Sequence, residues 1–413
     1  MPSHVSPDQI RARFSAAMSA MYRTEVPLYG QLLDIVASVN ATHGDAVDEG
    51  RLGAERHGAI RVGTAAELSA LRRLFAVMGM HPVGYYDLSV AGMPIHSTAF
   101  RPITAAAMTA NPFRMFCSLL RLEQVEERAV RDIAAEILAS RRICSDRLMD
   151  LIAQAEADGG LPDGDAAAFL DEAVGVFRWH GTARVDLATY RELVAAHRLV
   201  ADIVSFAGPH INHLTPRTVD IDAAQREMQR RGMVAKESIE GPPRRRCPIL
   251  LRQTSFKALS EPVSFGGETG AHTARFGEIE QRGAALTRKG RELYDTCLAA
   301  AQEAGDDPIA LASAFDEFPD DWSEMQREDL AFFYNEDHVS DTGESGTGPR
   351  PITYEDFLPV SAAGIFRSNL DTDRSKAGAG HPAQTELESA LGTQIHDPFV
   401  LYAADAARTA APG

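Results

Sequence analysis

The chain has 413 residues, of which 45% are hydrophobic and 24% are charged, proportions typical of a globular protein. Its 41 Lys and Arg residues against 58 Asp and Glu residues give a formal net charge of −17, which argues against a nucleic-acid-binding protein because that function needs a basic face. Residues 1–23 show no signal-peptide core, and no apolar run approaches the roughly 20 residues that a membrane helix needs.

The four cysteines indicate a reduced protein. They include no CxxC pair, so they do not form the pattern of a disulfide framework or a zinc site. They are Cys117, Cys144, Cys247 and Cys297. We therefore expect a cytoplasmic protein whose partners include neither nucleic acid nor a membrane, and the sequence leaves its oligomeric state open.

Residues 1–56 are predicted to form a helical N-terminal segment. Ser6 is suited to cap a helix over residues 7–40, because apolar residues recur there at helical spacing. The polar stretch of residues 44–55 that follows is typical of a loop.

Residues 57–122 are predicted to form the first of two similar modules. A short strand over residues 57–62 precedes Thr64 and Glu67, which have the spacing of a capping box and begin a helix that ends near Gly79. Three extended runs follow, at residues 82–90, 95–102 and 113–122. The order of this module is therefore βαβββ.

Residues 123–205 differ in character and are predicted to form a helical insertion. They contain long alanine-rich amphipathic runs at residues 126–155 and 166–177. The first of these runs is separated from the second by a glycine- and proline-containing break at residues 159–162.

Residues 206–284 repeat the strand and helix order of the first module. A strand over residues 210–215 precedes a helix over residues 222–231. Extended runs follow at residues 234–239, 249–259 and 274–283. Each copy opens with a histidine on its first strand, and the repeat is one of pattern rather than of residue identity. The sequence thus predicts an α+β fold.

Residues 285–413 are predicted to form a C-terminal helical region with a return segment. Helices are expected at residues 287–304 and 307–314, before a polar, glycine-rich loop at residues 336–350. The apolar stretch of residues 357–366 could return to line the core.

Histidines and carboxylates on separate predicted strands have the composition of a metal site. His57 and His213 lie on the first strands, and Glu278 and Glu280 share one face of the last strand. Two histidines and one carboxylate make a facial triad that suits non-haem Fe(II), although Mn(II), Co(II) and Zn(II) accept the same ligands. Strand alternation does not separate the two glutamates. His210 is three residues from His213 and faces the other side, so we interpret it as structural.

Several motifs resemble those of the 2-oxoadipate dioxygenase/decarboxylase family, also called 2-hydroxyglutarate synthases. They are H-G-x-x-R from His57, G-P-H-I-N-H-L-T from Gly208, R-F-G-E-I-E-Q-R-G-x-A-L-T from Arg275 and F-L-P-V-S-A-A-G-I-F from Phe357. The last-strand motif also resembles that of 4-hydroxyphenylpyruvate dioxygenases, in which such a glutamate binds iron. The resemblance implies a vicinal-oxygen-chelate-like cup of two βαβββ modules, with the helical insertion and terminal additions described above.

The resemblance also implies a set of site residues. Fe(II) would be bound by His57, His213 and Glu278, the last preferred over Glu280 because it falls in register with the dioxygenase glutamate. Substrate contacts would come from Arg61, Val360 and Ser361. Residues that could contact a metal ligand rather than the metal are His180, which adjoins Trp179, and Glu280.

The residues themselves support part of that assignment and leave part of it open. His57 and Arg61 are four positions apart on one strand, so both side chains face the same side. Arg61 could instead pair with a surface acid, and Ser361 could cap a helix.

The implied reaction consumes dioxygen, removes carbon dioxide from 2-oxoadipate and hydroxylates the product to 2-hydroxyglutarate, a step of lysine breakdown. Arg61 suits a substrate with a second carboxylate, since a guanidinium binds a carboxylate through two parallel hydrogen bonds. Three alternatives stay open: a same-fold dioxygenase for another 2-oxo acid, an oxygen-independent metal-dependent isomerase or lyase, and a non-catalytic protein that sequesters a small acid.

Overall fold

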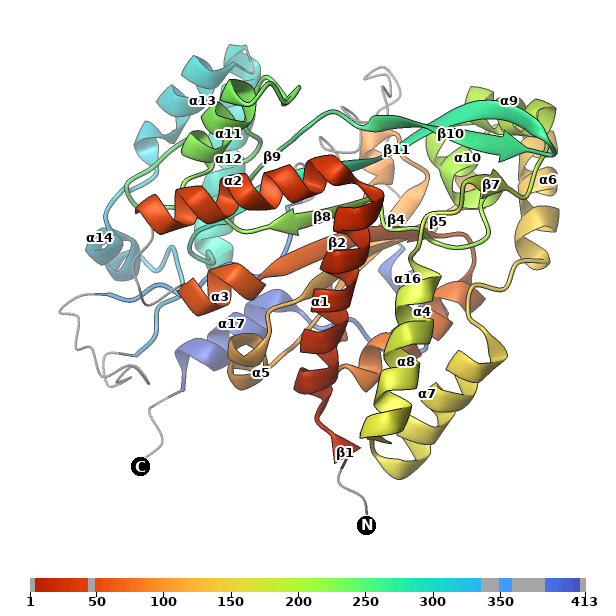
Figure 1. Ribbon diagram of the computed structural model, residues 1–413. Coiled ribbons are helices and arrows are strands. Elements are labelled where there is room, and N and C mark those ends of the chain that lie inside the picture. The colour runs from red at the N-terminus through yellow and green to blue at the C-terminus, as the bar shows by residue number, and fades with distance from the viewer. Residues whose placement is uncertain (1–3, 44–48, 306, 336–348, 359–382, 409–413) are drawn as a thin grey trace.

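The computed structural model describes residues 4–43, 49–305, 307–335, 349–358 and 383–408. Within these ranges a nine-stranded mixed sheet is surrounded by helices (Figure 1). A separate two-stranded sheet is formed by β1 (His4–Val5) and β6 (Leu161–Pro162). The strands of the large sheet are β2 (Arg56–Val62), β3 (His81–Asp87), β4 (Ile95–Arg101), β5 (Arg114–Leu120), β7 (Thr182–Ala183), β8 (His213–Pro216), β9 (Leu251–Ser255), β10 (Leu259–Phe265) and β11 (Glu268–Arg282).

The order of the large sheet places the first strands of the two predicted modules side by side. The order is β3-β4-β5-β2-β8-β11-β10-β7, with β9 paired to β11. β2 runs parallel to β5, β8 runs parallel to β11, and β2 and β8 are antiparallel neighbours. Their register sets Ala59 opposite His213.

The first module agrees with its prediction. β2 is followed by α4 (Ala65–Val77) and then by β3, β4 and β5, with the short helix α5 (Ala105–Ala110), which was not predicted, between β4 and β5. Thr64 caps α4 by accepting a hydrogen bond from the Glu67 backbone N–H at 3.2 Å. The Glu67 carboxylate accepts from the backbone N–H of Gly63 at 2.8 Å, so the capping box closes one residue earlier than expected.

The second module has the predicted order, and three of its four predicted strands overlap β8, β9 and β11. β8 precedes α11 (Ile221–Arg230), but residues 234–239 form no strand, since Ala235 makes only an isolated bridge. The run predicted at residues 249–259 is β9, and the hairpin of β10 and β11 was not predicted. Its turn at Gly266 and Gly267 has positive φ angles of 59° and 94°, which glycine adopts without strain. Pro262 is tolerated in β10 because β7 pairs only with residues 264 and 265.

β11 is long enough to pair with two strands along the same edge. Its first half pairs with β10, and residues 278–282 pair with β9. On its other side, Phe276 is in register with His213 of β8. Glu278 and Glu280 therefore lie between β8 and β9, where Glu278 faces Ser255 and Glu280 faces Gln253 across the ladder.

The N-terminal helix predicted over residues 7–40 is two helices. α1 (Pro7–Glu25) ends before Pro27, which has no N–H to continue the hydrogen-bond ladder and begins α2 (Pro27–His43). The Tyr22 hydroxyl on α1 donates to the carbonyl oxygens of Asn212 and Phe276, at 2.9 and 2.6 Å. These bonds fix α1 against the loop before β8 and the middle of β11.

Residues 123–205 are mainly helical, as predicted, but they also contain the short strands β6 and β7, and the amphipathic run at residues 126–155 is interrupted at residues 140–145. Helices α12 (Arg288–Ala304) and α13 (Pro308–Ala314) agree with the predictions for residues 287–304 and 307–314. Phe357 and Leu358 of the predicted return segment are buried, and residues 359–366 lie outside the described residues. The remaining helices are α3 (Glu49–Ala54), α6 (Arg128–Ala139), α7 (Asp146–Asp158), α8 (Asp163–Val176), α9 (Leu187–Ala196), α10 (Arg198–Ser205), α14 (Trp322–Arg327), α16 (Gln384–Leu391) and α17 (Pro398–Ala406), with short 3-10 turns at Ser89–Ala91, Leu122–Gln124 and Phe315–Glu317.

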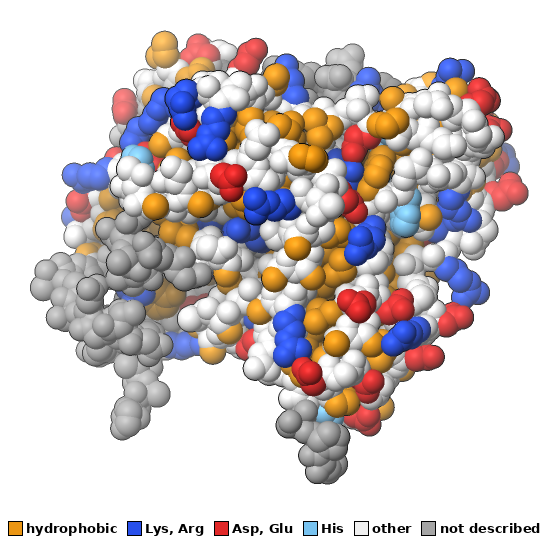
Figure 2. Space-filling view, viewed as in Figure 1, with side chains coloured by type: hydrophobic (Ala, Val, Ile, Leu, Met, Phe, Trp, Pro, Cys, Tyr) orange, Lys and Arg blue, Asp and Glu red, His pale blue; other side chains and the backbone are white. Residues whose placement is uncertain are grey.

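The two faces of the sheet are packed by different helices. Ile60 and Val62 of β2 join the apolar core under α1, α2, α4 and α8, whereas Ala59 joins the core on the opposite face. Because side chains alternate along a strand, His57 and Arg61 lie on the same face as Ala59. The face in Figure 2 carries interspersed acidic and basic side chains. Of the described helices, none is both long enough and apolar enough to span a bilayer.

Candidate metal centre

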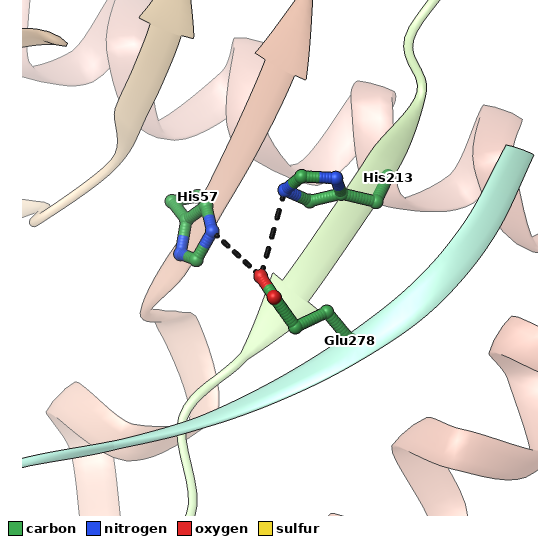
Figure 3. Close-up of side chains that lie close together, drawn as sticks. All are labelled: His57, His213 and Glu278. Atoms are coloured by element: carbon green, nitrogen blue, oxygen red, sulfur yellow. Dashed lines mark hydrogen bonds and ion pairs between the residues drawn. The ribbon is translucent and has the colours of Figure 1, made fainter. Parts of the chain in front are cut away.

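Three neighbouring strands bring His57, His213 and Glu278 together (Figure 3). The Glu278 Oε2 atom lies 3.1 Å from His57 Nε2 and 3.5 Å from His213 Nε2. The candidate ligand atoms all lie within 4.8 Å of one another. The side chains are 1%, 5% and 0% exposed, respectively, so bulk water has little access to them. We call this group the triad.

The register of β2, β8 and β11 explains this convergence. His213 is opposite Ala59, one inward position along β2 from His57, and next to Phe276, one inward position along β11 from Glu278. Residues two apart on a strand share a face. The three side chains therefore project from adjacent strands toward one point.

The triad combines a neutral imidazole with buried polar atoms that lack partners. Burial lowers the pKa of His213 to about 3, which leaves this imidazole neutral at physiological pH with a lone pair for a cation. Glu278 Oε2 accepts a hydrogen bond from the Thr215 hydroxyl at 2.9 Å. Among the described residues, no hydrogen-bond partner is found for Glu278 Oε1, His213 Nδ1 or the hydroxyl of Ser255, which faces Glu278 across the ladder.

Glu280 contacts the triad from behind His57. Its Oε2 atom lies 3.0 Å from His57 Nδ1, the ring nitrogen that faces away from Glu278. Arg282 donates two hydrogen bonds to the Glu280 carboxylate, at 2.9 and 2.7 Å. Burial alone would raise the pKa of Glu280, but Arg282 outweighs it and holds that pKa below its usual value. Glu278 thus reaches both histidines, whereas Glu280 reaches the outer nitrogen of one.

Arg61 is buried and pairs with an acid that the sequence did not reveal. Its Nη1 atom donates to Oδ2 of Asp202 on α10, at 2.5 Å. Both side chains are almost fully buried, at 3% and 2% exposure, so the partner is not a surface acid. The other oxygen of Asp202, Oδ1, lies 2.8 Å from His272 Nε2 and 3.2 Å from His210 Nε2. His210 therefore contacts Asp202.

A family model described as 2-oxoadipate dioxygenase/decarboxylase matches residues 14–369. The chain belongs to this family. A 2-oxoadipate dioxygenase/decarboxylase of Pseudomonas putida is 51% identical over 448 residues, covering 98% of this chain and 96% of the relative. One from Escherichia coli is 51% identical over 435 residues, covering 97% of each chain. One from Mycobacterium tuberculosis is 44% identical over 414 residues, covering 95% of each chain.

Solved structures give the same relationship. The hydroxyglutarate synthase of P. putida in complex with 2-oxoadipate matches with a TM-score of 0.89 and 49% identity, covering 99% of this chain and 98% of that one. A putative glyoxalase superfamily protein from Ralstonia eutropha matches with a TM-score of 0.54 and 21% identity, over 68% of this chain and 85% of that one. At that identity the second match shows a shared fold alone.

The structure does not place the other predicted site residues at the triad. Val360 and Ser361 lie outside the described residues. His180 is half-buried after α8, and within the described part of the chain it makes no hydrogen bond or ring contact with the triad. Phe357, which precedes Val360, does reach it: its ring centroid lies 4.9 Å from that of His57.

Buried ion pairs hold residues 355–357 of this family member in place. The sequence did not reveal them. Arg114 of β5 pairs with Glu55 at 2.8 Å and also with Glu355. Arg101 of β4 donates two hydrogen bonds to Asp356, at 2.8 and 3.0 Å. Arg114 and Glu355 are 241 positions apart, so no local pattern could have indicated the pairing. A cavity of about 400 Å³ lies beyond this segment, with Asp356 and Phe357 in its wall.

Proposed function

We propose that this protein converts 2-oxoadipate and dioxygen into 2-hydroxyglutarate and carbon dioxide. The observation that carries the proposal is the triad of His57, His213 and Glu278, with Arg61 on the same face of β2. The relatives at 51% identity that are named 2-oxoadipate dioxygenase/decarboxylase support it. So does the 2-oxoadipate bound to the hydroxyglutarate synthase of P. putida.

The triad residues fit Fe(II), and we propose that they bind it. Two imidazoles and one carboxylate match the ligand set of non-haem Fe(II) oxygenases and leave positions open for other ligands. The neutral His213 and the unpartnered Glu278 Oε1 are the donors that a buried cation requires. Bound Fe(II) would supply a coordination site for a 2-oxo acid and the redox chemistry that activates dioxygen.

The surrounding side chains prepare this site. Glu280 orients His57 by contacting its outer nitrogen, an arrangement common behind metal-bound histidines. The rings of Phe357 and Phe276 lie 4.9 and 4.7 Å from those of His57 and His213 and keep water away from the triad. A dry site strengthens the electrostatic interactions within it.

Arg61 is the proposed anchor for the second carboxylate of the substrate. A guanidinium binds a carboxylate through parallel charge-assisted hydrogen bonds, which fix direction as well as position. An anchor on the strand of His57 would hold the 2-oxo acid end of the substrate toward the triad. Positioning of this kind lowers the barrier to reaction because the reacting groups no longer need to find each other.

The finer description of the fold is also a proposal. The order βαβββ occurs twice, apart from the short helix α5 in the first module, and the glyoxalase superfamily likeness supports two modules that form a vicinal-oxygen-chelate cup around the triad. A cytoplasmic location and a role in lysine breakdown stay predictions. The four cysteines are unpaired, which suits a reducing compartment.

The experiment that tests the function loads the protein with Fe(II) anaerobically and then follows oxygen uptake. The substrates are 2-oxoadipate, 2-oxoglutarate and 4-hydroxyphenylpyruvate. We expect uptake with 2-oxoadipate, matched by equal amounts of carbon dioxide and 2-hydroxyglutarate. Oxygen uptake with only one of the other two acids would contradict 2-oxoadipate as the substrate. If protein that holds iron consumes no oxygen with any of the three acids, the proposed dioxygenase activity is wrong.

A further inference from the structure

A second buried group lies beside Arg61 and joins three parts of the chain. Asp202 comes from α10 of the helical insertion, His272 from β11, and His210 from the loop before β8. The three side chains are at most 4% exposed, and their candidate ligand atoms lie within 4.8 Å of one another. We call this group the Asp202 cluster.

The contacts of the Asp202 cluster are those of an anchor rather than of a metal site. Both carboxylate oxygens already have partners, since Oδ2 accepts from Arg61 and Oδ1 contacts His272 and His210. A metal ion there would sit against the Arg61 guanidinium, which would repel it. His272 is itself fixed, because its Nδ1 atom lies 2.8 Å from the Tyr190 hydroxyl on α9.

Aromatic packing makes the cluster rigid. The Trp179 ring centroid lies 4.8 Å from that of His210, and the Phe206 ring centroid lies 4.8 Å from that of His272. Arg61 lowers the pKa of Asp202 against the effect of burial, so the carboxylate stays ionised. An ionised carboxylate in a rigid setting fixes the position of the guanidinium that it binds.

We propose that Asp202 is a positioning residue, which holds Arg61 so that its guanidinium meets the second carboxylate of the substrate. This inference rests on the proposed function and deepens it, because it makes the helical insertion a determinant of substrate choice. A pre-positioned guanidinium loses less conformational entropy when it binds a carboxylate than a mobile one. Selectivity for a 2-oxo diacid over a 2-oxo monoacid then depends on Asp202 as well as on Arg61.

The test compares 2-oxoadipate with 2-oxohexanoate, which has the same chain length but no second carboxylate. Dissociation constants are measured by calorimetry on the Fe(II)-loaded protein without oxygen, and kcat/KM is measured with oxygen. For Asp202→Asn we expect binding of 2-oxoadipate to weaken about tenfold, the size of a lost charge-assisted hydrogen bond. Binding of 2-oxohexanoate and the iron content should not change.

Two further variants make the outcome decisive. Glu67→Gln removes a matched buried acid that joins the insertion to the first module, since Glu67 accepts from Arg141 at 2.6 Å. It should lower stability without changing the ratio of the two affinities. Asp202→Asn should have no further effect on that ratio when Arg61 is already alanine, as expected for residues that act through one another.

Two results would overturn the inference. One is an unchanged ratio of the two affinities in Asp202→Asn, which includes equal weakening of both acids, and the other is an effect of Asp202→Asn on that ratio that persists when Arg61 is alanine. Failure of the proposed function has a different signature: the wild type would bind 2-oxoadipate more tightly than 2-oxohexanoate but would not consume oxygen. In that case the binding ratios still test the role of Asp202.

Discussion

The triad and the Asp202 cluster have the same composition and different capacities. Each contains two histidines and one carboxylate, all buried, with candidate ligand atoms within 4.8 Å of one another. In the triad, Glu278 Oε1 lacks a hydrogen-bond partner among the described residues. In the Asp202 cluster, Arg61 and His272 occupy the two carboxylate oxygens, whereas neither ring nitrogen of His210 has a hydrogen-bond partner among the described residues. Residue types and proximity therefore do not by themselves predict a metal site, and the unpartnered carboxylate oxygen is what favours the triad over the Asp202 cluster in our proposal.

The charged side chains next to the triad also differ from those next to the Asp202 cluster. A second carboxylate, Glu280, lies behind the triad at His57, and its charge is compensated by Arg282 on the far side of that histidine. The neighbour of the Asp202 cluster is the cation Arg61, which already compensates the charge of Asp202. A cation added to the Asp202 cluster would therefore meet the Arg61 guanidinium directly, whereas in the triad the arginine lies one residue away, behind Glu280.

The largest expected effect is the loss of metal binding in Glu278→Gln. An amide lacks the charge that a buried divalent cation needs, so we expect affinity for Fe(II) to fall by more than about a hundredfold, beyond the effect of losing a supporting residue. Turnover should disappear with it. Iron analysis after gel filtration measures the effect, with Asp202→Asn as the matched control. Equal iron loss in both variants would end the distinction between the two groups.

The next effect is on substrate binding in Arg61→Ala. The loss of a charge-assisted hydrogen bond should lower kcat/KM for 2-oxoadipate about ten- to a hundredfold. Arg61→Lys should restore little of it, because an ammonium group cannot make the paired contact. Steady-state oxygen uptake measures both variants. Full activity of the lysine variant would show that charge alone suffices.

A smaller effect is expected on metal affinity in Glu280→Gln. Supporting residues behind metal-bound histidines contribute about ten- to a hundredfold, and the amide keeps one hydrogen-bond acceptor for His57, so we expect the lower end. Competition with a chelator of known affinity measures it. An unchanged affinity would mean that Glu280 serves only to hold Arg282.

The smallest effect is expected for Tyr190→Phe. This change removes the hydroxyl next to His272 but leaves Asp202 and Arg61 intact. A lost neutral hydrogen bond corresponds to about a two- to tenfold change, so we expect a shift of a few-fold in the affinity ratio of 2-oxoadipate to 2-oxohexanoate. Calorimetry measures it. An effect larger than that of Asp202→Asn would contradict the proposal, in which Tyr190 acts on Arg61 only through His272 and Asp202.

The sequence predicted those features that depend on local pattern. Alternation along β2 placed His57 and Arg61 on one face, and the helix between β2 and β3 began at Thr64 as expected. The break between α1 and α2 also had a local signal in Pro27, which the helical spacing of the flanking residues obscured.

Features that depend on distant partners could not be predicted from local pattern. Glu278 and Glu280 share a face, and only the register of β8 against β11 sets them apart. Asp202 lies on a helix, 141 positions from Arg61, so its pairing needs the packed structure. The β10–β11 hairpin had a local signal in its two glycines, but Pro262 weakened the strand pattern before it.

The strand order of the sheet has a consequence for synthesis of the protein. His57 and Glu278 are separated by 221 positions in the chain, so the ribosome adds Glu278 about 10 to 45 seconds after His57 at typical rates. During that interval β2 can pair with β5, but the carboxylate does not yet exist. A nascent chain can therefore complete its first module and still lack the triad. If the triad binds a metal ion as proposed, all three side chains can hold it only late in synthesis.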